Sequence, residues 1–258
     1  MSRISERFAG CQREGRAAFV AFLTAGDPSL DRSVEAALQL EAGGADVLEL
    51  GVPFTDPLAD GPVIQRASER ALAAGTTLAG VLGAARRIRA QSGLPLLLFS
   101  YLNPLLRPGL ERLAGEAREA GIDGVLVTDL PPEEAGEWIA IARERELDTV
   151  FLAAPTSPEA RLRRIAGSSR GFVYAVSRTG ITGAQASVSE EAAPLVARIR
   201  ATTEVPVALG FGISTPEQCA AVAQVADGVV VGSALVRRLE EDPGADLQEH
   251  VRWLKSEM

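Results

Sequence analysis

The chain has 258 residues, 47% of them hydrophobic, and a formal net charge of −8. This length and apolar content suit one large α/β unit with a sizeable core, so residues 1–258 are expected to form a single domain. The acidic balance and the lack of a basic block make nucleic acid and anionic membranes poor partners. No apolar run approaches the ~20 residues that a membrane-spanning helix needs.

Residue usage narrows the chemistry further. Two cysteines, Cys11 and Cys219, are too few for a disulfide framework and fit a reducing cytosol. The first ten residues hold no apolar stretch of signal-peptide length, so a cytoplasmic location is expected. Lys255 is the only lysine and His250 the only histidine. Chemistry that needs a core lysine or a histidine base is therefore largely excluded.

Eight short apolar or β-branched runs recur along the chain, separated by stretches with helical spacing. Nearly continuous apolar runs are typical of parallel strands covered on both faces. The stretches at 33–44, which ends on glycine, and at 112–121 predict helices. This alternation predicts an α/β fold, a single-domain (β/α)₈ TIM barrel with extra helices; a doubly wound open sheet is the alternative. The runs are residues 17–26, 46–53, 95–102, 124–131, 149–155, 171–177, 205–212 and 227–234.

The second run leads into ELGVPFTDPLADGP, which is rich in carboxylates. Glu49 shares one face of the predicted strand with Val47 and Gly51. Because a carboxylate facing the helix layer would be costly, this face should look into the lumen of a barrel, and Glu49 should lie near its mouth, where burial would raise its pKa. Asp60 lies in the loop that follows and can return over the mouth. Two carboxylates in different environments can divide acid and base roles. For Asp60, capping the helix that starts near Pro62 is an equally good interpretation.

The fourth and sixth runs add further polar candidates. Asp129 ends the fourth run, but the helix-starting string LPPEE follows it, so a capping role is favoured. Tyr174 lies in the sixth run and is expected at the mouth of the barrel. Arg178, just beyond it, either steers anions or is a solvated loop residue.

Glycine-rich turns follow the last three runs, in RTGITGAQAS, GFGIS and VGSALV. Glycine lets the backbone approach a ligand, and a helix N-terminus presents free N–H groups. The loops after strands 7 and 8 of a barrel are a frequent phosphate site, which Gly183 in the preceding loop can also reach. The sequence therefore predicts a phosphate site; tight turns alone are the alternative. Neither GxGxxG nor GK[ST] occurs, which argues against a dinucleotide or nucleoside triphosphate.

Apolar side chains also gather at the predicted strand ends. Each one alone is better explained as core, but together with a phosphate site they indicate a ligand with a flat apolar part at its other end. They are Phe22, Ile64, Phe99, Leu126, Leu152 and Phe211.

With these motifs in view, the chain resembles the tryptophan synthase α subunit family over essentially its whole length. The resemblance implies a carbon–carbon lyase of tryptophan biosynthesis, which cleaves indole-3-glycerol phosphate into indole and glyceraldehyde 3-phosphate by a retro-aldol reaction. The strings that carry it are LELGVPFTDPLADGPVIQ (48–65), FLTAGDP (22–28), VLVTDLP (125–131), SRTGITG (177–183), GFGIS (210–214) and VVGSA.

The resemblance also implies a role for each matching position. Glu49 would protonate indole C3 and act on the glycerol hydroxyl, while Asp60 would hydrogen-bond the indole N–H. Tyr174 would line the site beside Glu49, and Thr182 would belong to a mobile loop that closes onto Asp60. The phosphate would be held by Gly183, Gly212, Gly232 and Ser233, and the indole pocket would be lined or bordered by Phe22, Ile64, Phe99, Leu126, Thr128, Leu152 and Phe211.

The implied partner is a tryptophan synthase β subunit, in an allosteric α₂β₂ heterotetramer to which indole is passed. No cofactor is expected on this chain, and pyridoxal phosphate is expected only on the β subunit. Thr128 and Ser100 depart from residues common in the family without affecting the assignment. The residues that match the partner face are Asp56, Pro57, Asn103 and Pro104.

Composition agrees with this mechanism independently. A Schiff-base aldolase needs a lysine amine and a zinc aldolase normally uses several histidines, so cleavage must rely on indole as its own electron sink. Indole-3-glycerol phosphate synthase, a rival, would need a barrel lysine. Two more rivals are a non-catalytic allosteric barrel partner and a stand-alone lyase that releases free indole.

Overall fold

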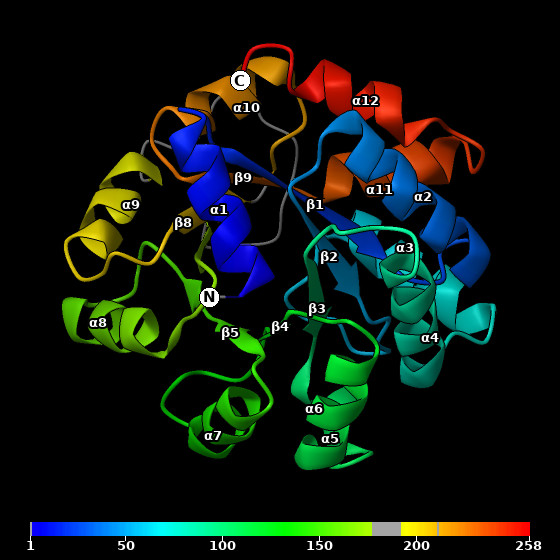
Figure 1. The fold of residues 1–258 in the computed structure, drawn as a ribbon. Coiled ribbons are helices and arrows are strands. Elements are labelled where there is room, and N and C mark those ends of the chain that lie inside the picture. The colour runs from blue at the N-terminus through cyan, green and yellow to red at the C-terminus, as the bar shows by residue number, and fades with distance from the viewer. Residues whose placement is uncertain (1, 177–191, 211) are drawn as a thin grey trace.

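Figure 1 shows the chain as a computed structural model, which describes residues 2–176, 192–210 and 212–258. Strands of the described part form one sheet in which neighbouring strands are parallel. Its order is β5-β4-β3-β2-β1-β9-β8-β7-β6. The strands are β1 (Ala18–Thr24), β2 (Val47–Gly51), β3 (Leu96–Ser100), β4 (Gly124–Val127), β5 (Asp148–Val150), β6 (Leu152–Ala153), β7 (Val173–Val176), β8 (Val207–Gly210) and β9 (Gly228–Val231).

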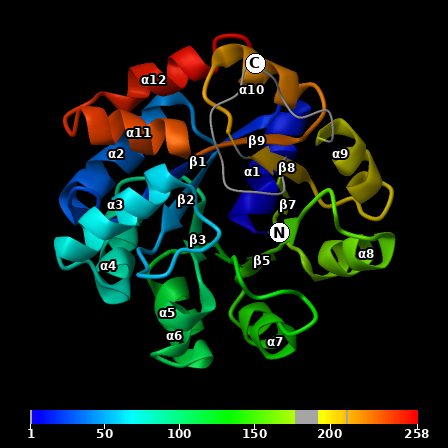
Figure 2. The same ribbon diagram turned by 180° about the vertical axis from the view of Figure 1, so that it is seen from behind.

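The two ends of this sheet are consecutive in the chain, because only Phe151 separates β5 from β6. Together they make up the single strand predicted at 149–155, so each of the eight predicted strands has its counterpart. The sheet curls into a barrel, as Figures 1 and 2 show from its two ends. The predicted TIM barrel is confirmed, and the open doubly wound sheet is wrong.

Helices surround the barrel on its outer side (Figure 2). The helix predicted at 33–44 is α2: Ser29 caps it by accepting from the Arg32 N–H at 3.1 Å, and Gly44 ends it at φ 100°. The helix predicted at 112–121 is α6. The described helices are α1 (Arg3–Arg13), α2 (Leu30–Gly43), α3 (Pro62–Ala73), α4 (Leu78–Arg89), α5 (Leu102–Leu106), α6 (Leu110–Glu119), α7 (Gly136–Glu144), α8 (Glu159–Ser168), α9 (Ala192–Arg200), α10 (Pro216–Ala223), α11 (Ser233–Glu241) and α12 (Leu247–Leu254).

Strand alternation separates two apolar layers. Val47 packs in a cluster inside the barrel, whereas Leu48 and Leu50 pack in the cluster between strands and helices. Since successive side chains of a strand point to opposite faces, Glu49 points inward, as the sequence predicts. A carboxyl group is thereby placed in the lumen.

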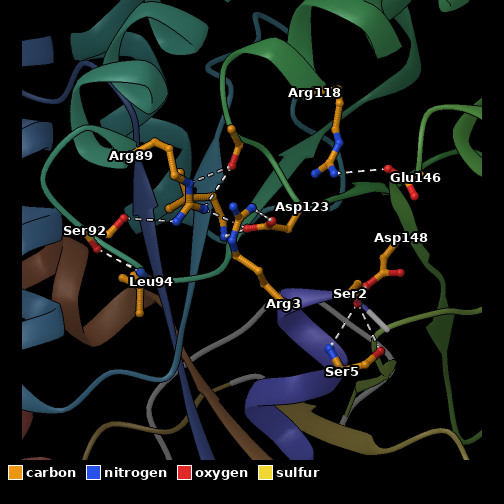
Figure 3. Close-up of polar contacts among 12 residues, drawn as sticks. Ser2, Arg3, Ser5, Arg89, Ser92, Leu94, Arg118, Asp123, Glu146 and Asp148 are labelled. Carbon is orange, nitrogen blue, oxygen red and sulfur yellow. Dashed lines mark hydrogen bonds and ion pairs between the residues drawn. The ribbon is translucent and has the colours of Figure 1, made fainter.

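The N-terminal ends of the strands are covered by α1, which lies across that end of the barrel in Figure 1. Its Ile4, Phe8 and Cys11 are buried in the inner cluster. Arg3 and Arg89 donate to the buried Asp123 carboxylate at 2.7 and 2.8 Å (Figure 3). This end is therefore closed by apolar and charged contacts, which leaves the opposite end for a ligand.

Three aspartates that immediately precede strands form a repeated device at this closed end, which the sequence pattern did not predict. Each accepts the backbone N–H of a neighbouring strand and so fixes the alignment of the two strands. The bonds run from Phe19 N–H to Asp46 (2.9 Å), from Leu96 N–H to Asp123 (2.9 Å) and from Val207 N–H to Asp227 (2.8 Å).

Candidate active site

A cavity opens at the carboxyl ends of the strands. Its empty space, together with open solvent at the mouth, is about 550 Å³. Residues from strand ends, from the loop after β2 and from the start of α11 meet there, as the barrel geometry requires. The lining residues are Phe22, Glu49, Ala59, Asp60, Gly61, Ile64, Phe99, Tyr174, Gly212, Ile213, Val230, Gly232 and Ser233.

Glu49 is the buried carboxyl group of this cavity. Its relative exposure is 1%, and neither carboxyl oxygen has a hydrogen-bond partner in the described part of the chain. Burial raises its pKa from 4.5 to about 8, because the charged form loses its hydration. At neutral pH Glu49 therefore holds a proton that it can donate.

Asp60 reaches the same cavity from the loop after β2 and is half-buried. Burial raises its pKa from 3.8 to about 6, and a hydrogen bond with Tyr101 opposes this rise. The Tyr101 hydroxyl also accepts the Ala59 N–H at 2.9 Å, which ties the loop to the end of β3. Gly61 is the N-cap of α3, so the structure does not place Asp60 in the capping position. At neutral pH Asp60 is mainly ionised.

Tyr174 of β7 stands beside both carboxyl groups. It is 6% exposed, and burial raises its pKa well above 10, with further contributions from the charges of Glu49 and Asp60. A Cβ at position 210 would lie only 2.5 Å from the Tyr174 hydroxyl oxygen. The ring therefore fits against β8 because residue 210 is glycine. The phenol is therefore neutral and firmly packed.

The apolar wall contains three of the predicted residues. Phe22, Ile64 and Phe99 line the cavity, and the rings of Phe22 and Phe99 meet edge to face with centroids 5.2 Å apart. A flat aromatic ligand suits such a wall.

Of the remaining predicted pocket residues, the three that the structure describes are not among those that line the cavity. Leu126 and Leu152 belong to the inner apolar cluster with Tyr174, and they are not among the residues that line the cavity. The Thr128 hydroxyl donates to the Ser100 carbonyl at 3.2 Å, so it borders the site without lining it. Phe211 lies outside the described residues.

The predicted phosphate end opens onto the same cavity through Gly212, Gly232 and Ser233. Gly232 is the N-cap of α11 and offers no side-chain cap, so the first N–H groups of the helix are available to an anion. Gly212 has φ 81°, which favours glycine independently of any ligand. Thr182 and Gly183 lie outside the described residues, as does Arg178.

The residues predicted to face a partner lie beside the mouth on the outer surface. Asp56 and Asn103 are exposed, and Pro57 and Pro104 are half-buried. The segments that carry them are joined by Phe54 and Tyr101, whose ring centroids are 5.3 Å apart. Two exposed apolar residues that were not predicted belong to these segments, Leu58 (86% exposed) and Leu106 (49%).

Asp129 and Lys255, two residues considered in the sequence, have clear places in the structure. The Asp129 carboxylate accepts the N–H of Leu102, the first residue of α5, at 2.7 Å. Asp129 therefore bonds to the start of α5, whereas the sequence predicted that it caps the segment that follows it. The Lys255 ammonium donates to the Gly44 carbonyl and lies 4.0 Å from Asp46, at the closed end of the barrel. Within the described ranges, no three His, Cys, Asp or Glu side chains are grouped to hold a metal ion.

Sequence reasoning also missed Tyr101, the partner of Asp60, and the lining residues Ile213 and Val230. Tyr101 belongs to the string SYLNP at the end of a predicted strand, and that position was the available signal. The sequence pattern does not show that the loop after the neighbouring strand β2 folds over Tyr101.

Comparison with known proteins gives a consistent result. A family model described as tryptophan synthase alpha chain matches residues 8–257. The tryptophan synthase alpha chain of Solibacter usitatus is 56% identical over 242 residues, covering 94% of this chain and 91% of that protein. The corresponding protein of Geobacter sulfurreducens is 54% identical over 252 residues, covering 97% and 95%.

Solved structures agree. A structure of Mycobacterium tuberculosis tryptophan synthase superimposes with a TM-score of 0.93 at 40% identity, covering 99% of this chain and 98% of that chain. A chain from the tryptophan synthase α₂β₂ complex of Pyrococcus furiosus gives a TM-score of 0.85 at 40% identity, covering 94% and 96%. Among the described residues, no helix combines the length and apolarity needed to cross a membrane.

Proposed function

The chain belongs to the tryptophan synthase alpha chain family, and from this premise we propose how its residues carry out the reaction. It is a lyase of tryptophan biosynthesis. Its proposed reaction is the cleavage of indole-3-glycerol phosphate into indole and glyceraldehyde 3-phosphate. The observation that carries the proposal is one cavity that holds a buried protonated carboxyl, a mainly ionised carboxylate and a free helix N-terminus.

The substrate has a charged end and a flat end, and the cavity has a place for each. We assign the phosphate to the backbone around Gly212, Gly232 and Ser233, where the N-terminus of α11 favours negative charge. The indole ring is assigned to the aromatic wall of Phe22 and Phe99. The glycerol chain then crosses the middle of the cavity, toward which Glu49 points from β2.

Glu49 is assigned both proton transfers. It first donates its proton to indole C3, which makes the ring an iminium ion that can accept an electron pair. It then takes the proton of the neighbouring hydroxyl; the bond between indole C3 and the glycerol chain breaks, and its electrons return to the ring. The hydroxyl carbon becomes the aldehyde. Glu49 ends in its starting protonation state, and no net proton is consumed.

Asp60 is assigned to the ring nitrogen. As a carboxylate it accepts a hydrogen bond from the indole N–H, and this bond strengthens as positive charge develops on the ring. Tyr101 holds the Asp60 loop through the Ala59 N–H, so the carboxylate is already in place before the substrate arrives. Tyr174 packs beside Glu49 and helps to keep water from it.

We propose that the chain needs no cofactor of its own. The indole ring supplies the electron sink, and the sole lysine lies at the closed end of the barrel, so a Schiff base at the mouth is not available. Indole-3-glycerol phosphate synthase, which needs such a lysine, is not supported. We also propose a cytoplasmic location, since both cysteines are buried free thiols.

The chain works with a β subunit, and we propose an α₂β₂ heterotetramer in which pyridoxal phosphate is bound only by the β subunit. An interface needs apolar and polar surface. The exposed Leu58 and Leu106 supply the apolar surface, and the exposed Asp56 and Asn103 supply the polar surface. Indole is apolar, so its transfer through this face would prevent its escape. The stand-alone lyase and the non-catalytic barrel are not favoured by the family assignment.

The direct test of the proposed function is an indole-release assay with purified chain and indole-3-glycerol phosphate, with and without a matched β subunit. Release in both cases, faster in the complex, supports the proposal. Equal rates would support the stand-alone lyase. Binding of substrate without any release, in either condition, would support the non-catalytic barrel.

A further inference from the structure

Helices α3 and α11 lie side by side on the outside of the barrel, and both begin at its mouth (Figure 2). Helix α3 follows Asp60 and Gly61 directly, and its Ile64 lines the cavity. Helix α11 begins at Ser233, which lines the cavity from the phosphate side. The spacing of these two helix starts therefore sets the distance between the carboxylate and the phosphate end.

Close to the cavity, the seam between the helices is apolar. Val63 and Ala67 of α3 and Val236 of α11 are buried in one small cluster together with Phe22 of β1. Such contacts bring the helices together without any directional bond between them.

One turn further along the same seam, the contact is ionic and directional. Arg70 lies one helical turn after Ala67 on α3, and Glu240 lies one turn after Val236 on α11. The Arg70 Nη1 donates to Glu240 at 2.8 Å, while its Nε and Nη2 donate to the two oxygens of Asp27 at 2.8 and 2.7 Å. One guanidinium thus joins α3, α11 and the loop after β1.

Four charged side chains make up this ionic cluster: Asp27, Arg66, Arg70 and Glu240. Asp27 is only 5% exposed, and its bidentate bond to Arg70 has a fixed geometry. Arg66 donates to both oxygens of Glu240 at 2.7 and 2.8 Å. Bonds from Arg66 and then Arg70 lower the pKa of Glu240 to about 2, so the carboxylate stays charged throughout the neutral range.

We propose that Arg70, through Glu240, is a positioning residue that sets α3 against α11 and thereby holds Asp60 at the right distance from the phosphate-binding start of α11. The proposal rests on the proposed function. Arg70 does not line the cavity, so its effect passes through the helices. A substrate that must engage both ends at once depends on this distance, whereas phosphate alone does not.

The test compares two probes on the full chain. One is inorganic phosphate, and the other is a non-cleavable analogue in which a saturated three-carbon chain joins indole to phosphate. Glu240→Gln weakens the bonds that Glu240 accepts from both Arg70 and Arg66 of α3, and it leaves Asp27 paired with Arg70. Arg70→Lys is the second variant, because a lysine keeps the charge but loses the bidentate geometry. Removing the charge of Arg70 altogether would leave the buried Asp27 carboxylate unpaired, which is why it is avoided.

The matched control is Glu159→Gln. It weakens another arginine–glutamate bond between neighbouring helices, from Arg198 of α9 to Glu159 of α8 at 2.7 Å, across the barrel from α3 and α11 (Figure 2). Urea unfolding of all variants shows whether the stability loss is similar.

For both Glu240→Gln and Arg70→Lys we expect analogue affinity to fall about tenfold and phosphate affinity to stay within about twofold. Turnover should fall roughly 10- to 100-fold, since small misplacements of reacting groups have effects of this size. Glu159→Gln should change none of these values. Equal losses for both probes, or the same analogue affinity in Glu240→Gln and Glu159→Gln, would overturn the positioning role. A wild-type chain that fails to bind the analogue would instead refute the proposed function, and the positioning role with it.

Discussion

At the scale of single residues, the burial of Glu49 has a measurable cost. The folded chain keeps the Glu49 proton up to about pH 8, whereas the unfolded chain releases it near pH 4.5. Between these values the folded state binds more protons than the unfolded state, so stability falls as pH rises. A neutral side chain would be less costly at this position, and a buried carboxyl group with a raised pKa is typical of a functional site.

Glu49→Gln should therefore be stabilised relative to wild type in a pH-dependent way. The difference in free energy of unfolding should be constant below about pH 4.5 and should then shift in favour of the variant by up to ~1.4 kcal/mol per pH unit until about pH 8. Urea unfolding at a series of pH values measures this. A difference that does not change with pH would show that Glu49 has an ordinary pKa in the folded chain.

Asp60→Asn separates catalysis from local structure. Gly61 is the N-cap of α3, so the variant should keep the fold, yet an amide cannot stabilise the positive ring as a carboxylate does. We expect indole release to fall by at least ~10²-fold. The control is Asp56→Asn in the same loop, outside the cavity lining. Normal release by Asp60→Asn would remove Asp60 from the mechanism.

At the scale of elements, the start of α11 makes a prediction that depends on charge alone. Ser233→Asp puts a negative charge in the first turn, which suits the helix but repels an anion. Its neutral counterpart Ser233→Asn has nearly the same shape. Titration with inorganic phosphate should show at least ~10-fold weaker binding to the Asp variant than to the Asn variant, without loss of stability. Equal affinities would place the phosphate elsewhere.

Gly212 is a poor target for the same question. Its φ of 81° means that Gly212→Val would strain the backbone whether or not a phosphate binds nearby. For a Cβ at Gly232, by contrast, the nearest atoms of the described residues belong to Phe22 at 3.4 Å, which is an ordinary contact. Gly232→Ala is therefore the better glycine variant for testing the anion site.

The strand pattern explains how much of the structure could be predicted. The apolar runs correctly predicted all eight strands of the barrel, and the alternation of side chains along the second strand correctly placed Glu49 inside it. Both predictions depend only on local periodicity. The helix that starts at Pro62 was predicted, but the break at Phe151 and the second helix between β2 and β3, α4, were not. The contact between Asp60 and Tyr101 could not be predicted from local periodicity either, because it depends on how a loop folds over a neighbouring strand. Leu126 and Leu152 lie in the inner cluster and are not among the lining residues, since a position near a strand end does not give depth in the barrel.

At the scale of the whole molecule, the two ends of the barrel have different roles. The closed end carries α1 and the aspartates that align the strands, so its contacts serve stability. The open end carries the cavity, and beside it the exposed Leu58 and Leu106. A partner bound there would contact the loop that holds Asp60, which gives a direct route from assembly to the active site.

Leu58→Ser should therefore weaken activation by the β subunit while leaving the isolated chain nearly unchanged. Leu58 is 86% exposed and outside the cavity lining, so its loss matters only where a partner covers it. Trp253→Ser is the control, because Trp253 is also exposed (49%) but belongs to α12. Titration with β subunit while following cleavage gives both affinity and activation. Similar effects of the two variants would show that this face is not the interface.

The central claim is that Glu49 moves the proton that breaks the carbon–carbon bond. Its most direct test is the rate of indole release by Glu49→Gln, measured in complex with a β subunit at saturating indole-3-glycerol phosphate. The amide is nearly isosteric but cannot exchange the proton, so we predict normal binding of the non-cleavable analogue and at least ~10²-fold slower release. Near-normal release by a preparation shown to be free of wild-type chain would contradict this claim.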